Sequence, residues 1–176
     1  WTCTLRSFPD ITQPNVNITG VNTTLPRGRD FDDVRVFLAT GRVVRYIPKL
    51  LDTIFPSLFG LRFENTQLSY VSKDDLKPYP KLRLFTSVLN RIEFLEADLF
   101  ENNPELEFIN FRSNQIKYIH PNVFDSLKDK LEHLWIDGTA IPCGLRGAAT
   151  NENVNRQLAV LKNSQCVNLD NAPAFY

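Results

Sequence analysis

The chain has 176 residues, enough for one domain with a substantial hydrophobic core. Its 20 lysines and arginines balance 20 aspartates and glutamates, so charge gives no reason to expect DNA, RNA or an acidic membrane as the partner. No run of 18 or more apolar residues occurs, so we expect no membrane-spanning helix.

Residues 1–33 precede the regular pattern. They open at Trp1 with polar, cysteine-bearing sequence and no signal peptide, and we expect this to be a processed mature start. Alternating apolar residues predict a short strand over residues 16–21. Two N-x-S/T sequons, NIT and NTT, begin at Asn17 and Asn22. We expect both asparagines to carry glycans on an outward-facing surface, as in a secreted protein.

Residues 34–142 repeat one spacing. In LEFINFRSNQIKYIHPNVFDSL, residues 106–127, the apolar residues fall at steps that fit neither a helix nor a plain strand. The same offsets begin at positions 34, 58, 82, 106 and 131, which are separated by 24, 24, 24 and 25 residues. Five copies in phase indicate a repeat protein in which each copy buries its apolar side against the next.

Within each copy the LxxLxL stretch predicts a short strand with one buried face. The asparagine that follows, at Asn90 and Asn114, has an amide that can pair with backbone groups where the chain turns out of the strand. The rest of the copy returns along the other side, and Phe124 and Leu127 are predicted to point into the core.

This spacing resembles the leucine-rich repeats of extracellular animal proteins over residues 34–142. The resemblance implies an α/β solenoid of about five coils, right-handed, with a parallel sheet on its concave side. The open ends of a solenoid expose apolar core, so we expect an N-terminal cap over residues 1–33 and a C-terminal cap over residues 143–176. More loosely, the chain resembles the short leucine-rich repeat immune proteins that insects secrete, and a role in innate immunity is what that likeness implies.

The C-terminal cap is predicted to be helical. Val154, Leu158 and Leu161 lie at i, i+4 and i+7, on one face of a short helix. Cys143 and Cys166 flank this helix, and a disulfide between them would tie it to the last coil and add about 3 kcal/mol of stability. Two buried free thiols are the alternative interpretation.

Cys3 has no second cysteine in the N-terminal cap. It is expected to lie too far along the solenoid to reach either cysteine of the C-terminal cap. It is therefore predicted to be a free thiol or an intermolecular link, and a buried, unreactive cysteine is the plain alternative.

Catalysis has little support in the sequence. The two histidines, His120 and His133, fall in different repeats, and no CxxC, HExxH, GxSxG or phosphate-loop motif occurs. We therefore expect neither an enzyme nor a cofactor or metal site.

The concave face is the better candidate for function, because the strand residues between the buried ones face outward. Exposed aromatic residues beside arginine are typical of binding hot spots. The candidate ligand-binding residues are Phe108, Asn110, Arg112, His133, Trp135, Arg62 and Leu84. The alternative is that a small solenoid exposes some apolar atoms anyway, or that its own termini cover this face.

Two functions stay open at this point. The first is a secreted recognition module that binds a protein or a cell-surface or microbial ligand through the concave face. The second is a structural or assembly subunit of an extracellular complex or matrix, joined through Cys3 or the sheet face into a disulfide-linked or non-covalent dimer or larger body.

Overall fold

The computed structural model describes residues 2–5, 9–20, 25, 27–136 and 148–162. Its strands and helices, in chain order, are β1 (Thr2–Leu5), η1 (Phe31–Asp33), β2 (Val36–Thr40), α1 (Leu51–Ile54), β3 (Gly60–Glu64), α2 (Lys73–Leu76), β4 (Leu84–Val88), β5 (Phe94–Leu95), β6 (Phe108–Asn110), β7 (Tyr118–Ile119), η2 (Asp125–Leu127), β8 (His133–Trp135), β9 (Ala148–Thr150) and α3 (Asn151–Lys162).

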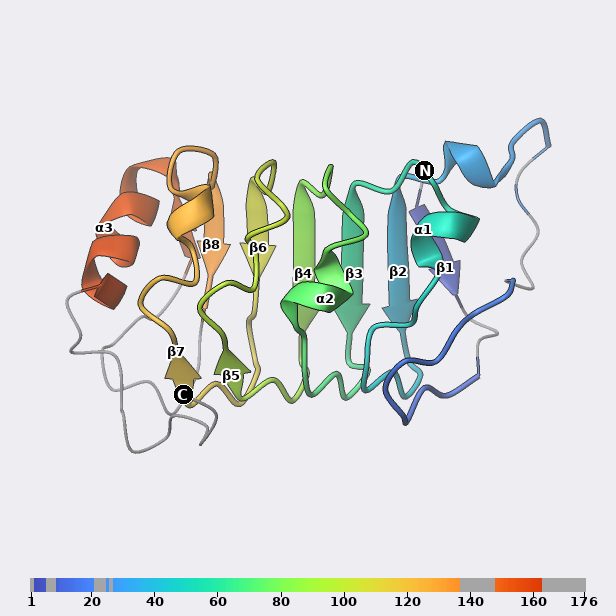
Figure 1. The fold of residues 1–176 in the computed structure, drawn as a ribbon, viewed down its shortest axis with the longest axis horizontal. Coiled ribbons are helices and arrows are strands. Elements are labelled where there is room, and N and C mark those ends of the chain that lie inside the picture. Colours follow the sequence, from blue (N-terminus) through green and yellow to red (C-terminus); the bar gives the residue numbers. More distant parts are fainter. Residues whose placement is uncertain (1, 6–8, 21–24, 26, 137–147, 163–176) are drawn as a thin grey trace.

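Seven strands form one sheet in the order β1-β2-β3-β4-β6-β8-β9 (Figure 1). All neighbours from β1 to β8 are parallel, and β9 pairs antiparallel with β8. The strands β2, β3, β4, β6 and β8 fall in the five predicted copies of LxxLxL. Equivalent residues of successive copies are paired: Phe37, Leu61, Phe85, Ile109 and Leu134 form one buried row. The predicted parallel sheet is confirmed.

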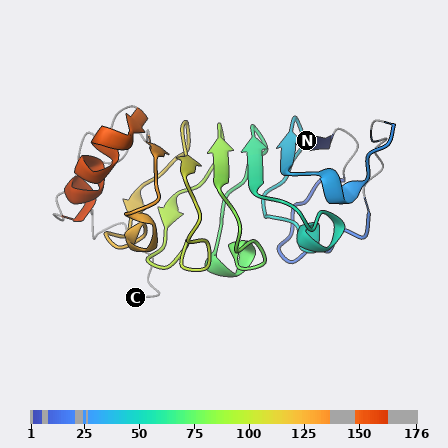
Figure 2. The same cartoon turned by 90° about the horizontal axis from the view of Figure 1, so that it is seen from above.

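The return segments lie on one side of this sheet. Figure 2 shows the helices α1 and α2 opposite the strands, and the short parallel pair β5–β7 joins two neighbouring returns. The core between the two sides is rich in phenylalanine rings. Phe100 contacts Phe85 at 6.3 Å between ring centroids and stacks on Phe124 at 5.8 Å. Phe124 and Leu127 are buried, as predicted for the return.

The asparagine of the repeat links its own coil to the preceding one. The side-chain oxygen of Asn90 accepts hydrogen bonds from the backbone amides of Thr66 and Leu68, at 3.0 and 3.1 Å. Its amide nitrogen donates to the carbonyl oxygen of Phe63 at 2.8 Å. All three partners belong to the preceding coil, so each such asparagine fastens its own coil to the one before. Asn114 forms the same kind of link one coil further on, to the amide of Ile92 and the carbonyl of Ser87. It also donates to the carbonyls of Phe111 and Arg112 in its own coil.

The N-terminal segment differs from the sequence prediction. The edge strand of the sheet is β1, whereas around residues 16–21 the described backbone forms only an isolated bridge between Asn17 and Lys49. Ile11 forms a second bridge with Val44, and Ile18 is buried. The alternation at Val16 and Ile18 therefore reports side chains that are half-buried and buried, and the described backbone there pairs too briefly to make a strand.

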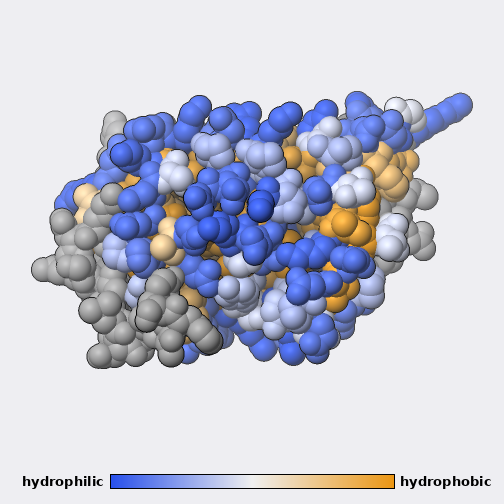
Figure 3. Space-filling model, in the orientation of Figure 1, coloured by the Kyte–Doolittle hydropathy of each residue, from blue (hydrophilic) through white to orange (hydrophobic). Residues whose placement is uncertain are grey.

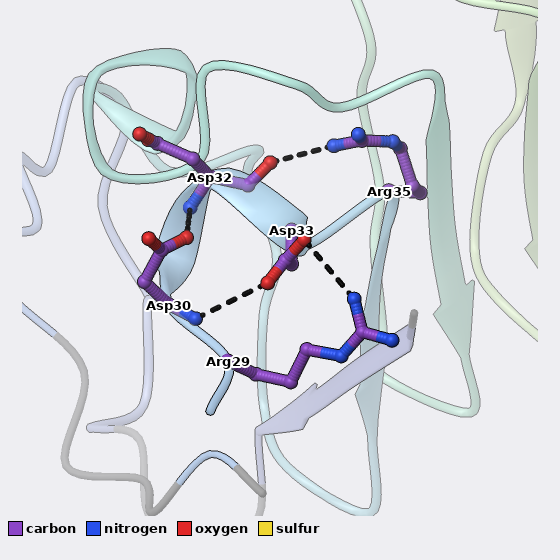
Figure 4. Close-up of polar contacts among 5 residues, drawn as sticks. All are labelled: Arg29, Asp30, Asp32, Asp33 and Arg35. Carbon is purple, nitrogen blue, oxygen red and sulfur yellow. Dashed lines mark hydrogen bonds and ion pairs between the residues drawn. The ribbon is translucent and has the colours of Figure 1, made fainter. Parts of the chain in front are cut away.

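The turn η1 leads into β2 and is closed by side-chain caps (Figure 4). Asp30 accepts from the backbone amide of Asp32 at 3.0 Å, and Asp33 accepts from the backbone amide of Asp30 at 3.3 Å. Arg35 then donates to the carbonyl oxygen of Asp32 at 2.6 Å. These bonds satisfy amides that a short helix leaves unpaired, so the chain enters the sheet at a defined point.

The C-terminal helix is present where the sequence predicts it. In α3, Val154 and Leu158 are buried, which agrees with an apolar helical face turned toward the last coil. The antiparallel strand β9 directly before it has no counterpart in the sequence prediction. Cys143 and Cys166 lie outside the described residues, so their disulfide stays a prediction.

Candidate binding face

The outer face of the sheet is defined here as the side away from α1 and α2. Strand pairing places the outward residues of successive strands side by side on it. Leu84 is paired with Phe108, and Phe108 with His133. Asn110 is paired with Trp135 in the next row. These side chains are half-buried, whereas the inward residues between them are fully buried.

Three aromatic side chains meet at the β6–β8 end of the outer face. The ring of Phe108 lies 5.4 Å from that of His133 and 4.6 Å from that of Trp135, measured between centroids. The rings of His133 and Trp135 stack at 5.8 Å with 12° between their planes. We call Phe108, His133 and Trp135 the aromatic trio. The ring atom Nδ1 of His133 is buried and has no hydrogen-bond partner.

A glycine extends the apolar surface away from the trio. A Cβ atom at Gly60 would lie 2.9 Å from the side chain of Val36 and 3.3 Å from that of Leu84. The side chains of the two flanking strands thus close over Gly60, where any larger residue would push them apart. An apolar stripe results, running from Val36 over Gly60 to Leu84 and the aromatic trio.

A polar row runs beside this stripe. Arg62 forms an ion pair with Glu64 on the same strand, and its Nε atom is buried without a partner. Thr86, on the neighbouring strand, is only 4% exposed, and its hydroxyl also has no partner. Arg62 is separated from the aromatic trio by β4, whereas the candidate residue Leu84 lies on β4 itself, directly beside the strand of Arg62.

Arg112 lies beyond the end of β6 and is exposed. Its backbone amide donates to the side-chain oxygen of Asn110 at 2.9 Å. Simple alternation along the strand predicts Arg112 at a third outward position, opposite Val88. The paired residues of β4 and β6 instead stop at Asn110, so Arg112 belongs to the turn.

The turn that follows each of four strands contains a residue with left-handed backbone. These residues are Gly41, Asn65, Leu89 and Ser113, with φ of 66°, 52°, 55° and 55°. Left-handed backbone costs an ordinary L-residue roughly 1–2 kcal/mol, and glycine and asparagine are the residues that tolerate it best. Leu89 has the only large apolar side chain of the four, and it is 59% exposed. Sequence reasoning missed it, although comparing position 89 with 41, 65 and 113 would have singled it out.

The opposite side of the molecule has a different character. Figure 3 shows a mostly hydrophilic surface on the side that carries α1 and α2, with a hydrophobic patch beside α1. Among the described residues no group of three or more histidine, cysteine, aspartate or glutamate side chains is placed to hold a metal ion. Within the same residues, no helix has the length and apolar character needed to cross a bilayer.

The predicted modification sites are only partly described. Asn17 is exposed, while Asn22 lies outside the described residues. The backbone of Cys3 pairs with that of Phe37 between β1 and β2. The structure does not describe the side chain of Cys3.

Comparisons with known proteins agree with this architecture. Residues 88–141 match the family model described as leucine rich repeat. A solved structure of the Toll–Spatzle complex, described as a molecular hub in Drosophila development and innate immunity, contains a similar chain. The match has 24% identity and a TM-score of 0.52, and it covers 58% of this chain and 14% of that one. No curated protein matched. The chain thus spans a small part of that structural neighbour, whose likeness shows the fold alone. Together, the family match and the observed pairing identify an α/β leucine-rich repeat domain with a parallel sheet.

Proposed function

We propose that this chain is a secreted recognition module of innate immunity that binds a protein or surface ligand through the outer face of its sheet. The aromatic trio is the observation that carries the proposal. Three rings packed on one another remain half-buried on a face that the fold does not need for its core. In this proposal residues 34–142 form the binding body, and residues 1–33 and 143–176 are the caps.

The rigidity of the aromatic trio favours binding. Aromatic side chains bring large contact areas and lose little conformational entropy on binding, which makes them frequent hot-spot residues. Phe108 and Trp135 already constrain each other at 4.6 Å. A partner would therefore meet a surface that is ordered in advance of binding, next to the apolar stripe that ends at Leu84.

The extracellular and immune parts of the proposal rest on other support. The leucine-rich repeat match and the similar chain in the Toll–Spatzle complex are consistent with them. Asn17 begins a sequon and is exposed. When the chain is produced in a secretory host, we expect glycans at Asn17 and Asn22. Treatment with a glycosidase should lower the mass, and an unchanged mass would remove this support for secretion.

The binding test uses a triple variant, Phe108→Ala, Arg112→Ala and Trp135→Ala. A partner is first captured from the extracellular fluid of the source on the immobilised wild-type chain and identified by mass spectrometry. Its affinity for both chains is then measured by titration calorimetry. The variant should bind at least about 2 kcal/mol more weakly if these residues are the anchors. Its far-ultraviolet circular dichroism and melting temperature should stay close to those of the wild type.

The matched control is a second triple variant in which alanine replaces three exposed residues outside the sheet strands, Leu50, Tyr70 and Arg91. This control should keep full affinity. Unchanged affinity of a folded triple variant would place the binding surface elsewhere. Loss of folded structure in the triple variant would show that the aromatic trio serves the core instead.

A further inference from the structure

We propose that Arg62 and Thr86 form a polar subsite of the binding face, and that the partner protein places the side-chain amide of an asparagine or glutamine in it. This inference rests on the proposed function, because the subsite lies on the same outer face as the aromatic trio. The observations are two buried hydrogen-bond donors without acceptors, at directly paired positions of neighbouring strands.

Buried polar atoms without partners are concentrated on the outer face. Among the described residues, four buried side-chain nitrogen and oxygen atoms have no hydrogen-bond partner. Three of them are Nε of Arg62, Oγ1 of Thr86 and Nδ1 of His133, and all three residues face outward from the sheet. The fourth, Oδ1 of Asn103, lies between β5 and β6. Buried polar atoms of native proteins are almost always hydrogen-bonded, so this concentration indicates where a partner's polar groups would bind.

The hydroxyl of Thr86 does nothing for the fold that a methyl group would not do. Thr86 is only 4% exposed, so its hydroxyl is removed from water, and it has no hydrogen-bond partner in return. Valine has the same shape and would avoid this cost. Thr66, a second buried threonine, shows the contrast, because its hydroxyl donates to Oδ1 of Asn90 at 3.0 Å. The hydroxyl of Thr66 thus serves the fold, and that of Thr86 is left to serve binding.

The donors and acceptors of the subsite determine which group fits it. Nε of Arg62 can only donate and the hydroxyl of Thr86 can donate, so both need an acceptor oxygen. Glu64 accepts from Arg62 and keeps lone pairs for another donor. A carboxylate of the partner would meet the like charge of Glu64, whereas an amide is neutral. The amide oxygen can accept from Arg62 and Thr86 while the NH2 group donates to Glu64.

The subsite can open without a change in the fold. The side chain of Arg62 is 41% exposed, and its ion pair with Glu64 joins two residues of one strand. Exposed side chains change rotamer within nanoseconds. Arg62 is paired directly with Thr86 across β3 and β4. Turning the side chain of Arg62 outward would therefore bring its Nε to the surface and uncover one side of Thr86.

The subsite and the aromatic trio share one row of the sheet. Strand pairing aligns Arg62, Thr86, Asn110 and Trp135 at the same level of four neighbouring strands. At about 4.8 Å between strands, Thr86 lies roughly 10 Å from Trp135. Residues three positions apart in an extended segment are also separated by about 10 Å. A partner segment that crosses the strands would place its amide about three residues from an apolar side chain on the trio.

The experiment selects peptides of about 12 residues, displayed on phage, against the folded wild-type chain. Selected peptides are synthesised, and their affinities are measured by titration calorimetry for wild type, Thr86→Val, Thr66→Val and Trp135→Ala. Thr66→Val is the matched control, because it removes the partnered hydroxyl of a buried threonine in the turn after β3. Each peptide is also remade with its asparagine or glutamine replaced by aspartate or glutamate, which have the same shape.

We expect the selected peptides to share an asparagine or glutamine about three residues from an aromatic or aliphatic residue. Thr86→Val should weaken them about tenfold and keep or raise the melting temperature, by up to about 4 °C. Thr66→Val should keep the affinity and lower the melting temperature by about 2–4 °C. The acidic versions of the peptides should bind the wild type about tenfold more weakly, because they bring a like charge to Glu64.

The contrary outcomes separate the subsite from the proposed function. Peptides weakened by Trp135→Ala but not by Thr86→Val would overturn the subsite alone. Peptides that keep their affinity when the amide becomes an acid would overturn the assignment of an amide. Peptides that ignore both substitutions, or a library without binders, would overturn the subsite together with the proposed function. A fall in melting temperature for Thr86→Val as large as that for Thr66→Val would show that the Thr86 hydroxyl serves the fold.

Discussion

Replacing Asn90 by alanine tests how neighbouring coils are held together. The substitution removes the partner of three buried backbone groups, the amides of Thr66 and Leu68 and the carbonyl of Phe63. A buried polar group left without a partner costs about 1–3 kcal/mol, so the three together set a range of about 3–9 kcal/mol. Water that enters the vacated space would offset part of this cost. We therefore expect a loss near the lower end, about 3 kcal/mol or slightly more.

The assay is thermal and urea unfolding followed by circular dichroism. For a chain of this size, about 3 kcal/mol corresponds to a fall in melting temperature of roughly 6–12 °C. Asn114→Ala should cost less, because the side-chain oxygen of Asn114 accepts from one backbone amide, that of Ile92. Its other bonds go to carbonyl groups, which tolerate a missing partner better than amides do. Gln115→Ala, at an exposed position, is the control and should change stability by less than about 0.5 kcal/mol. A loss for Asn114→Ala equal to or larger than that for Asn90→Ala would refute the reasoning.

Two further predictions concern the core and the cysteines. Phe111→Ala and Phe124→Ala each remove a buried ring and should each cost about 3–5 kcal/mol in chemical unfolding. Changes within error at both positions would mean that the rings contribute little to the packing. Peptide mapping under non-reducing conditions should yield a peptide pair joined through Cys143 and Cys166. A peptide pair joining Cys3 to Cys143 would contradict the predicted caps, and a disulfide-linked dimer on non-reducing gels would support the assembly role of Cys3.

The repeated spacing is sufficient to predict the sheet and the rows of its outer face. Side chains alternate across a strand, so the inward positions must be apolar in every copy, and a constant period of about 24 residues aligns those positions between neighbours. For this reason the period alone places Phe108 and His133 side by side. The helix around Val154 follows in the same way, from apolar residues at helical spacing.

Pairings outside the repeat depend on the tertiary structure. The strand β1 has no periodic signal, and its place is set by the unpaired edge of β2, with which it forms parallel bonds. The strand β9 completes the other edge through antiparallel bonds to β8. In both cases the partner's exposed backbone groups determine the pairing, and these groups have the same chemistry in every sequence.

The sequence by itself determined which side chains face inward, because burial follows from apolar character at a regular period. Only the tertiary structure decided which groups those side chains meet. The sequence predicts that the amide of Asn90 serves a turn, and the fold shows that the turn belongs to the preceding coil. The left-handed backbone at Leu89 is likewise hidden in the sequence, since the equivalent turns at Gly41, Asn65 and Ser113 adopt it with quite different residues.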